Sequence, residues 1–132
     1  MFSVLLPFLF VITPNLPQPP VDVRLNQEFE VRVGETVTIK SEGLKINLIR
    51  VDEDSRCPEG VQCVWAGNGK VVLKLMKARK RAAIKNLNTN LDPKSAAYRG
   101  YDVKLVNLSP YPKKDVAIRK KEYVATLVVS RE

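Results

Sequence analysis

The sequence contains no histidine, a single tryptophan and only two cysteines among 132 residues. Without histidine, the chain lacks the usual general base near neutral pH and the commonest ligand of catalytic metals. Two cysteines alone cannot supply the four ligands of a closed structural zinc site, and their spacing is not the C-x-x-C of a redox dithiol. No carboxylate pair or Ser–Lys dyad is recognisable either. We therefore expect a protein that is not an enzyme and uses no cofactor.

Long apolar runs are also scarce. The N-terminal one, residues 1–12, is shorter than the about 20 residues that a transmembrane helix needs. It is typical of the apolar core of an export signal, with an uncleaved anchor as the alternative. The prolines between residues 13 and 20 predict an extended spacer. We expect residues 1–20 to be an export signal or N-terminal anchor with its proline-rich spacer, and residues 21–132 to be a single β-domain.

The two cysteines lie in a short segment that can close on itself. Pro58 has a fixed φ and Gly60 permits a positive φ, so the chain can curl back and bring Cys57 and Cys63 within bonding range. A ring of this size contributes about 2 kcal/mol of stability in the chain-entropy model. We interpret the pair as a structural disulfide, with free thiols, metal binding and redox activity as alternatives. A disulfide predicts an oxidising location, either secreted or in the periplasm or cell envelope.

The residues that follow the cysteines carry a turn signal. Trp65 lies two residues after the second cysteine, and on a strand both would face the same way. We expect its indole to pack over the disulfide in the core, with an exposed binding aromatic as the alternative. The pair Asn68 and Gly69 is typical of a type I′ turn and separates residues 61–66 from residues 70–76, both of strand composition. This pattern predicts a β-hairpin.

Residues 54–68 read D-S-R-C-P-E-G-V-Q-C-V-W-A-G-N. This segment resembles a signature of small, uncharacterised bacterial exported proteins and lipoproteins. In that family a V-x-L-x-L strand follows, matched here by residues 71–75. A later Y-x-V-x-L strand, matched by residues 101–105, runs into a proline-rich turn, matched by residues 110–112. The resemblance covers roughly residues 30–130 and implies a secreted or envelope-attached β-domain without an established activity. One departure is that no lipobox cysteine follows the N-terminal apolar run.

Alternating apolar and polar residues with turn signals between them predict an all-β fold. We expect an antiparallel sandwich or small barrel of about seven to eight short strands with one local disulfide loop. The first two strands should pair as a hairpin across Gly34. A change of face at Ile49 indicates a bulge or a strand covered on both sides, and residues 94–97 should form a short helical turn. The expected strands are 29–33, 36–40, 44–51, 61–66, 70–76, 83–87, 101–108 and 123–129.

An acidic cluster, Asp52, Glu53 and Asp54, precedes the cysteines. Carboxylate oxygens can hold Ca²⁺, but the spacing of a calcium loop is absent. Successive side chains on an extended chain also point in alternating directions. We expect Asp54 instead to cap backbone N–H groups or to pair with Arg56.

The net charge of +8 predicts acidic partners, with a solvated basic surface as the alternative. Residues 70–85 contain seven basic residues and no acidic one. We favour a hairpin with its tip at residues 78–81 over a helix from residue 76 to residue 87. The tip is a candidate site for an anionic envelope polymer or lipid surface. We do not expect nucleic acid, because interleaved aromatic residues are absent. The candidate contacts are Lys77, Arg79, Lys80, Arg81 and Lys85.

Two functions fit these patterns. The first is a non-catalytic exported or cell-envelope β-sandwich module that binds an anionic envelope component or a protein through loops at the sheet ends. The alternative is a secreted inhibitor of a protease or other hydrolase, in which residues 56–61 enter the enzyme's cleft. The disulfide would preorganise such a loop and so reduce the entropy lost on binding.

Overall fold

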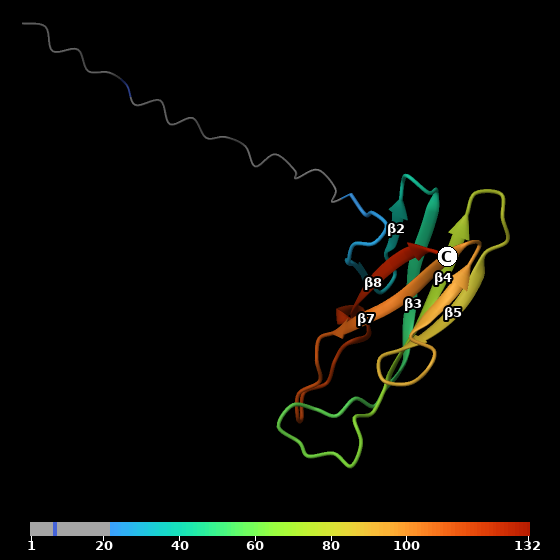
Figure 1. Cartoon of the computed structure of the whole chain (residues 1–132). Coiled ribbons are helices and arrows are strands. Elements are labelled where there is room, and N and C mark those ends of the chain that lie inside the picture. The colour runs from blue at the N-terminus through green and yellow to red at the C-terminus, as the bar shows by residue number, and fades with distance from the viewer. Residues whose placement is uncertain (1–6, 8–21) are drawn as a thin grey trace, which may run out of the picture.

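A computed structural model of the chain describes Pro7 and residues 22–132. The expected export segment, residues 1–20, therefore lies outside the described residues except for Pro7. The described part of the chain forms eight strands in two four-stranded antiparallel sheets that pack face to face as a sandwich (Figure 1). Its one helical element is a 3₁₀ turn, η1 (Lys120–Glu122). The prediction of an all-β antiparallel sandwich is confirmed.

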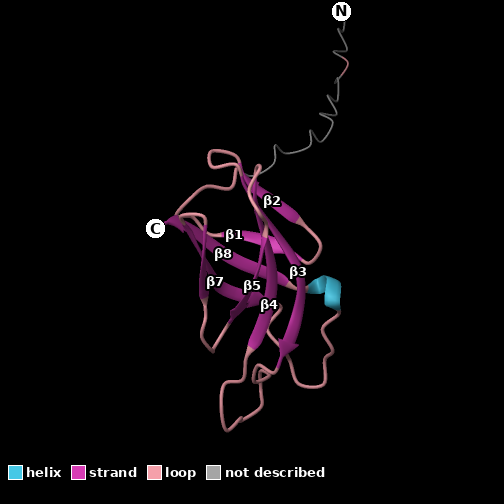
Figure 2. Ribbon diagram, turned by 90° about the vertical axis from the view of Figure 1, so that its right-hand side faces the viewer, coloured by secondary structure: helices cyan, strands magenta, loops and turns pink. Residues whose placement is uncertain are grey.

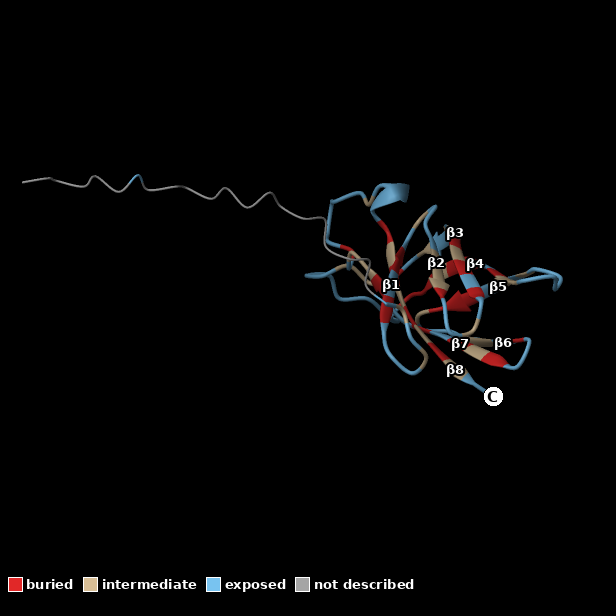
Figure 3. Ribbon diagram, turned by 90° about the horizontal axis from the view of Figure 1, so that it is seen from above, coloured by how far each residue is buried: buried red, intermediate tan, exposed pale blue. Residues whose placement is uncertain are grey.

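One sheet has the strand order β1-β8-β7-β6 and the other β2-β3-β4-β5. The chain changes sheet after β1 and again after β5, so β1 and β2 flank one side of the sandwich while β5 and β6 flank the other (Figure 3). The strands are β1 (Phe29–Arg32), β2 (Thr36–Ile39), β3 (Leu44–Asp54), β4 (Gly69–Lys77), β5 (Ala83–Asn88), β6 (Ser95–Tyr98), β7 (Tyr101–Ser109) and β8 (Val124–Arg131).

The core lies between the inner faces of the two sheets, where buried residues appear red in Figure 3. The predicted change of face in β3 is a bulge, because the register against β4 shifts between Leu48 and Arg50. The extra residue, Ile49, returns Val51 to the inner face opposite Val71. The fully buried residues of the core include Val31, Ile46, Leu73, Val103 and Leu127.

The expected hairpin between the first two strands is wrong. β1 pairs with β8, and β2 pairs with β3. Gly34 has a φ of 85° and carries the chain from one sheet to the other, while its N–H donates to the carbonyl oxygen of Leu48 at 2.8 Å. Alternation predicts which side chains face the core, but it does not say which strand lies alongside.

The expectation of a short helical turn at residues 94–97 is also wrong, because Ser95–Tyr98 form β6 and pair with β7. The two strands join through Arg99 and Gly100, whose φ values of 49° and 85° are those of a two-residue hairpin turn. By contrast, the expected hairpin with its tip at residues 78–81 is confirmed between β4 and β5.

Candidate functional site

Residues 55–68 form a long loop between β3 and β4 at the lower end of the sandwich (Figures 1 and 2). The expected hairpin across Asn68 and Gly69 is wrong, because residues 61–66 form no strand and Gly69 is already the first residue of β4. The strands on either side pair with each other instead, with Asp54 opposite Gly69. The cysteine loop is therefore the connection of the β3–β4 hairpin itself.

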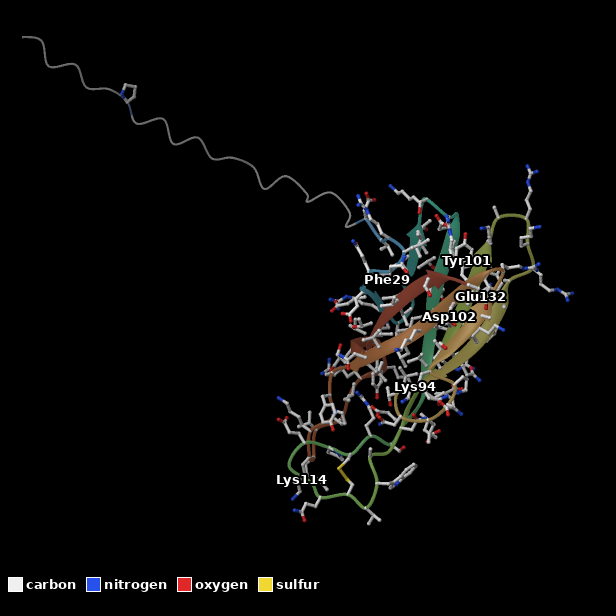
Figure 4. All side chains as sticks on the ribbon, viewed as in Figure 1. Phe29, Lys94, Tyr101, Asp102, Lys114 and Glu132 are labelled. Carbon is white, nitrogen blue, oxygen red and sulfur yellow. A yellow bond between two sulfur atoms is a disulfide. The ribbon has the colours of Figure 1, made fainter. Side chains whose placement is uncertain are left out.

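Cys57 and Cys63 are joined by a disulfide within this loop, as predicted (Figure 4). Their Cα atoms lie 5.9 Å apart. The N–H of Cys57 donates to the carbonyl oxygen of Ala66 at 2.9 Å, which draws the two arms of the loop together. A disulfide indicates an oxidising, extracytoplasmic location.

An ion pair between Arg56 and Asp54 fixes the base of the loop. The guanidinium donates from Nε to Oδ1 at 2.7 Å and from Nη2 to Oδ2 at 2.8 Å, a bidentate geometry. Arg56 is only 6% exposed. The predicted pairing of these two residues is confirmed, and the same carboxylate also accepts the backbone N–H of Arg56 at 3.4 Å.

The buried guanidinium also reaches across to the other sheet. It donates to the carbonyl oxygen of Leu108 at 2.5 Å and to that of Pro110 at 2.9 Å. On the far side of the ion pair, the hydroxyl of Tyr123 donates to Oδ2 of Asp54 at 2.8 Å. This buried charge is therefore paired and saturated with hydrogen bonds, which is the condition under which burial of an ion is tolerated. The network joins the end of β3, the end of β7 and the residue directly before β8.

The network shifts two pKa values. Burial acts to raise the pKa of Asp54, but the hydrogen bonds from Arg56 and Tyr123, with the positive charge of Arg56, outweigh it and lower that pKa. Burial and the hydrogen bond to Asp54 raise the pKa of Tyr123 to about 12. Both shifts keep the network in one protonation state throughout the neutral range.

The lowered pKa of Asp54 predicts a loss of stability in acid. Asp54 contributes stability above the ordinary aspartate pKa of 3.8, and this contribution is lost as the pH falls through the lower pKa of the folded state. We expect the free energy of unfolding of wild type to exceed that of Asp54→Asn at neutral pH, and this gap to narrow in acid. Urea denaturation at a series of pH values measures it. A gap that stays constant down to about pH 2, well below the unfolded pKa, would contradict the prediction.

Asn68 forms a second buried anchor. Its Nδ2 donates to Oδ1 of Asn88 at 2.9 Å, and its Oδ1 accepts the backbone N–H groups of Asn90 at 3.1 Å and Leu91 at 3.3 Å. The side chain expected in a type I′ turn is instead a fully buried hydrogen-bonding group. Next to it, a Cβ on Gly69 would lie 2.9 Å from Cδ2 of Leu108, so a larger residue at this position would require the Leu108 side chain to shift.

A second loop, residues 110–118, lies alongside the cysteine loop. The N–H of Glu59 donates to the carbonyl oxygen of Pro112 at 2.8 Å, and the guanidinium of Arg56 lies 5.8 Å from the ring centre of Tyr111. Figure 4 shows Lys114, from the same segment, at the disulfide end of the molecule. We call residues 55–68 and 110–118 together the loop end.

The loop end carries most of the exposed large apolar side chains. Trp65 is 60% exposed and does not pack in the core, so that expectation is wrong. The expectation required a strand, and a segment without a strand partner has no inner face to which a side chain can point. Five of the eight large apolar residues exposed in the described chain belong to the loop end: Val61, Val64, Trp65, Tyr111 and Val116.

The basic tip, residues 78–81 between β4 and β5, projects away from the loop end (Figure 1). Arg79, Lys80 and Arg81 are exposed, and no ion pair of the described chain includes them. The other two candidate contacts are placed differently. Lys77 donates to the hydroxyl of Tyr101 at 2.9 Å, and half-buried Lys85 faces the core side opposite Leu73.

The carboxylates of the acidic cluster engage separate basic partners. Asp52 pairs with Arg50 at 2.6 Å, and Glu53 lies 3.9 Å from Nζ of Lys70, while Asp54 belongs to the network at the loop base. In the part of the chain that the structure describes, no three such residues are grouped so that they could hold a metal ion.

Sequence reasoning recognised the Arg56–Asp54 pair but missed its partners. Tyr123 was expected only as a strand residue, and it lies 69 positions from Asp54 along the chain. The partners at Leu108 and Pro110 are backbone carbonyl groups, so the identity of these residues does not reveal the contact. The burial of Asn68 was not predicted, because an Asn-Gly pair is the strongest short sequence signal for a hairpin turn.

Comparison with protein-family models, curated proteins and solved structures finds no match to this chain. Within residues 22–132, no helix has the length and hydropathy that a membrane crossing requires. The chemistry of the loop end and of the basic tip is therefore the basis on which a function can be argued.

Proposed function

We propose that this protein is a non-catalytic β-sandwich module, exported to an oxidising compartment, that binds a protein partner through its loop end. The observation that carries the proposal is the exposure of Val64 and Trp65 on a loop whose base is fixed by a disulfide and a buried ion pair. Clustered apolar side chains on a protein surface mark interaction sites, because exposing them to water is unfavourable.

The construction of the loop favours tight recognition. The disulfide, the Arg56 network and the bonds of Asn68 hold the base before any partner arrives, so less conformational entropy is lost on binding. Trp and Tyr are enriched among the residues that dominate binding energies, and Trp65 and Tyr111 are both more than half exposed.

The same geometry supports the inhibitor function, but the segment that would contact the enzyme is residues 61–65 and not residues 56–61. Arg56 is buried and Pro58 is half-buried, so within residues 56–61 only Glu59, Gly60 and Val61 are exposed to an enzyme cleft. Residues 61–65 carry the exposed side chains. A hydrolase with an apolar cleft is the partner of this second candidate function, and binding would block its substrate.

The basic tip supports contact with anionic envelope components. Arg79, Lys80 and Arg81 supply three exposed positive charges on a narrow hairpin, and such a cluster attracts anionic polymers and lipid headgroups. This contact would be electrostatic and sensitive to salt. It is independent of the loop end, which lies elsewhere on the molecule (Figure 1).

A crosslinking experiment tests the loop end. A photoreactive residue placed at position 65 is expected to capture a protein from envelope extract, which mass spectrometry identifies. Val64→Asp/Trp65→Ala should then weaken the affinity of the purified partner by at least about 30-fold, the effect of losing one dominant contact. Calorimetric titration measures the affinity, and a fall in the partner's hydrolytic activity on binding would favour the inhibitor function.

Ile84 provides the matched control. It is 56% exposed on β5, away from the loop end, so Ile84→Asp should leave the affinity unchanged. An affinity that survives Val64→Asp/Trp65→Ala but is lost on reversing the charges of Arg79, Lys80 and Arg81 would refute the loop end as the binding surface.

A further inference from the structure

A groove of about 630 Å³ opens on the side of the sandwich flanked by β1 and β2. Its apolar lining comes from Val23, Phe29 and Val37. These side chains are buried or half-buried and pack against the core, so the floor of the groove is fixed. In Figure 3, β1 lies on the side of the molecule opposite the hairpin of β4 and β5.

The rim of the groove is acidic, although the chain as a whole carries a net charge of +8. Among the described residues, four carboxylates line it and only one cation, Arg24, which lies 3.9 Å from Asp22. The other three, Glu28, Glu30 and Glu35, are exposed and are absent from the ion pairs of the described residues. Like charges around one concavity reinforce each other, so the groove attracts cations.

The basic tip has the complementary properties. It is convex where the groove is concave, and its Arg79, Lys80 and Arg81 match in number the three carboxylates that lack an ion pair. The tip is the turn of a two-stranded hairpin, and Arg79 sits at its bend with a φ of 60°. The same chain therefore carries both halves of one electrostatic contact, on opposite sides (Figure 3).

We propose that the groove between β1 and β2 receives the basic tip of a second copy of this chain. The two surfaces differ and lie apart, so the contact is head-to-tail and can repeat from copy to copy. The overall positive charge does not prevent it, because repulsion between distant charges is screened beyond about 8 Å at physiological salt, while the paired charges meet at contact. The inference does not rest on the loop end, which lies elsewhere and stays uncovered in such an assembly.

Sedimentation velocity of the purified protein tests the proposal. In about 0.1 M NaCl, the sedimentation coefficient should rise with protein concentration, and in about 1 M NaCl, where the screening length falls to about 3 Å, the rise should disappear. A wild-type protein that stays monomeric up to about 1 mM in the lower salt overturns the proposal. So does association that 1 M salt leaves unchanged.

Two charge-reversed variants identify the surfaces. Arg79→Glu/Lys80→Glu/Arg81→Glu alters the tip and Glu28→Lys/Glu30→Lys/Glu35→Lys alters the groove, and each variant alone should lose association. An equimolar mixture should recover it, because every tip then meets a groove of opposite sign on the other variant. Both variants keep a positive net charge, starting from +8, so attraction between their overall charges cannot explain a recovery.

A third variant controls for the change in net charge. Lys113→Glu/Lys114→Glu/Lys120→Glu reverses as many exposed lysines near the loop end as the tip variant reverses cations. It should associate like wild type. A mixture of the first two variants that stays monomeric, with circular dichroism showing both folded, overturns the proposal, as does a control variant that also loses association. The salt dependence of wild-type association tests the proposal even if a variant fails to fold.

Discussion

Replacing Arg56 by methionine is expected to destabilise the domain by about 3–5 kcal/mol, the cost of removing one partner from a buried ion pair. Methionine fills much of the same space but donates no hydrogen bond. Asp54 would keep its charge at 12% side-chain exposure without its counterion, and the carbonyl oxygens of Leu108 and Pro110 would each lose a donor. Urea denaturation monitored by Trp65 fluorescence and by circular dichroism measures the change.

Arg50 provides a matched control on the same strand. It pairs with Asp52 at 2.6 Å, also two residues away, but its side chain is 57% exposed. Exposed pairs contribute little, because water screens the charges and both side chains lose freedom, so Arg50→Met should cost less than about 1 kcal/mol. Equal losses of unfolding free energy in the two variants would show that burial does not make the Arg56–Asp54 pair more stabilising than the Arg50–Asp52 pair. They would contradict the role of Arg56 in stabilising the loop base.

Replacing Gly67 by alanine is expected to cost about 3 kcal/mol or more. Gly67 has a φ of 73°, and a Cβ at this position would overlap the carbonyl oxygen of Ser55 and lie 2.8 Å from Cα of Arg56. Both are backbone atoms, so no side-chain rotation relieves the overlap. The flanking hydrogen bonds, from Ser55 N–H to Asn68 at 2.7 Å and from Cys57 N–H to Ala66 at 2.9 Å, hold the two arms of the loop at this separation.

A comparison with Gly60 separates the backbone strain of a positive φ from the steric overlap at Gly67. The φ of Gly60, 82°, is as unfavourable for alanine as that of Gly67, but nothing lies within 4 Å of the position of a Cβ. Gly60→Ala should therefore cost only the backbone strain, about 1–2 kcal/mol. Chemical denaturation of both variants measures the difference, and equal losses would mean that the approach of Ser55 to Gly67 contributes nothing to stability.

These two predictions concern the base of the cysteine loop, whereas the proposed binding residues lie at its exposed part. Arg56 and Gly67 hold the two arms together, and Val64 and Trp65 lie between them in the sequence with their side chains in solvent. A variant at the base should lower stability and binding together. A variant at Val64 or Trp65 should lower binding alone, because Val64 is fully exposed and Trp65 lies outside the core.

How far the sequence predicted the site depended on the distance along the chain between interacting residues. The disulfide and the Arg56–Asp54 pair join residues six and two positions apart, and both were predicted. The partners of that pair are Leu108 on β7 and Tyr123 just before β8, 52 and 69 positions away, and no pattern in the sequence pointed to them. Local chemistry limits which neighbours can interact, but it does not say which distant strand is adjacent.

Trp65 and Asn68 show the same limit through burial. Both expectations followed from local preferences, a large indole in the core and an Asn-Gly pair in a type I′ hairpin turn. In the structure Trp65 is exposed and Asn68 is fully buried, because β3 and β4 pair around the whole segment with Asp54 opposite Gly69. Asn68, directly before β4, donates to Asn88 on the neighbouring strand β5, whereas Trp65 has no neighbouring strand.

The sequence by itself predicted the class of fold, the disulfide and the basic hairpin tip, and it limited the change of face in β3 to a bulge or a strand covered on both sides, because each depends on periodicity, spacing or composition within a few residues. Only the tertiary structure decided that β1 and β2 belong to different sheets, that the cysteine loop contacts residues 110–118, and that an acidic groove faces away from the basic tip. Many strands have similar local patterns and could pair with one another, and the packing of the complete core determines which pairing is the most stable.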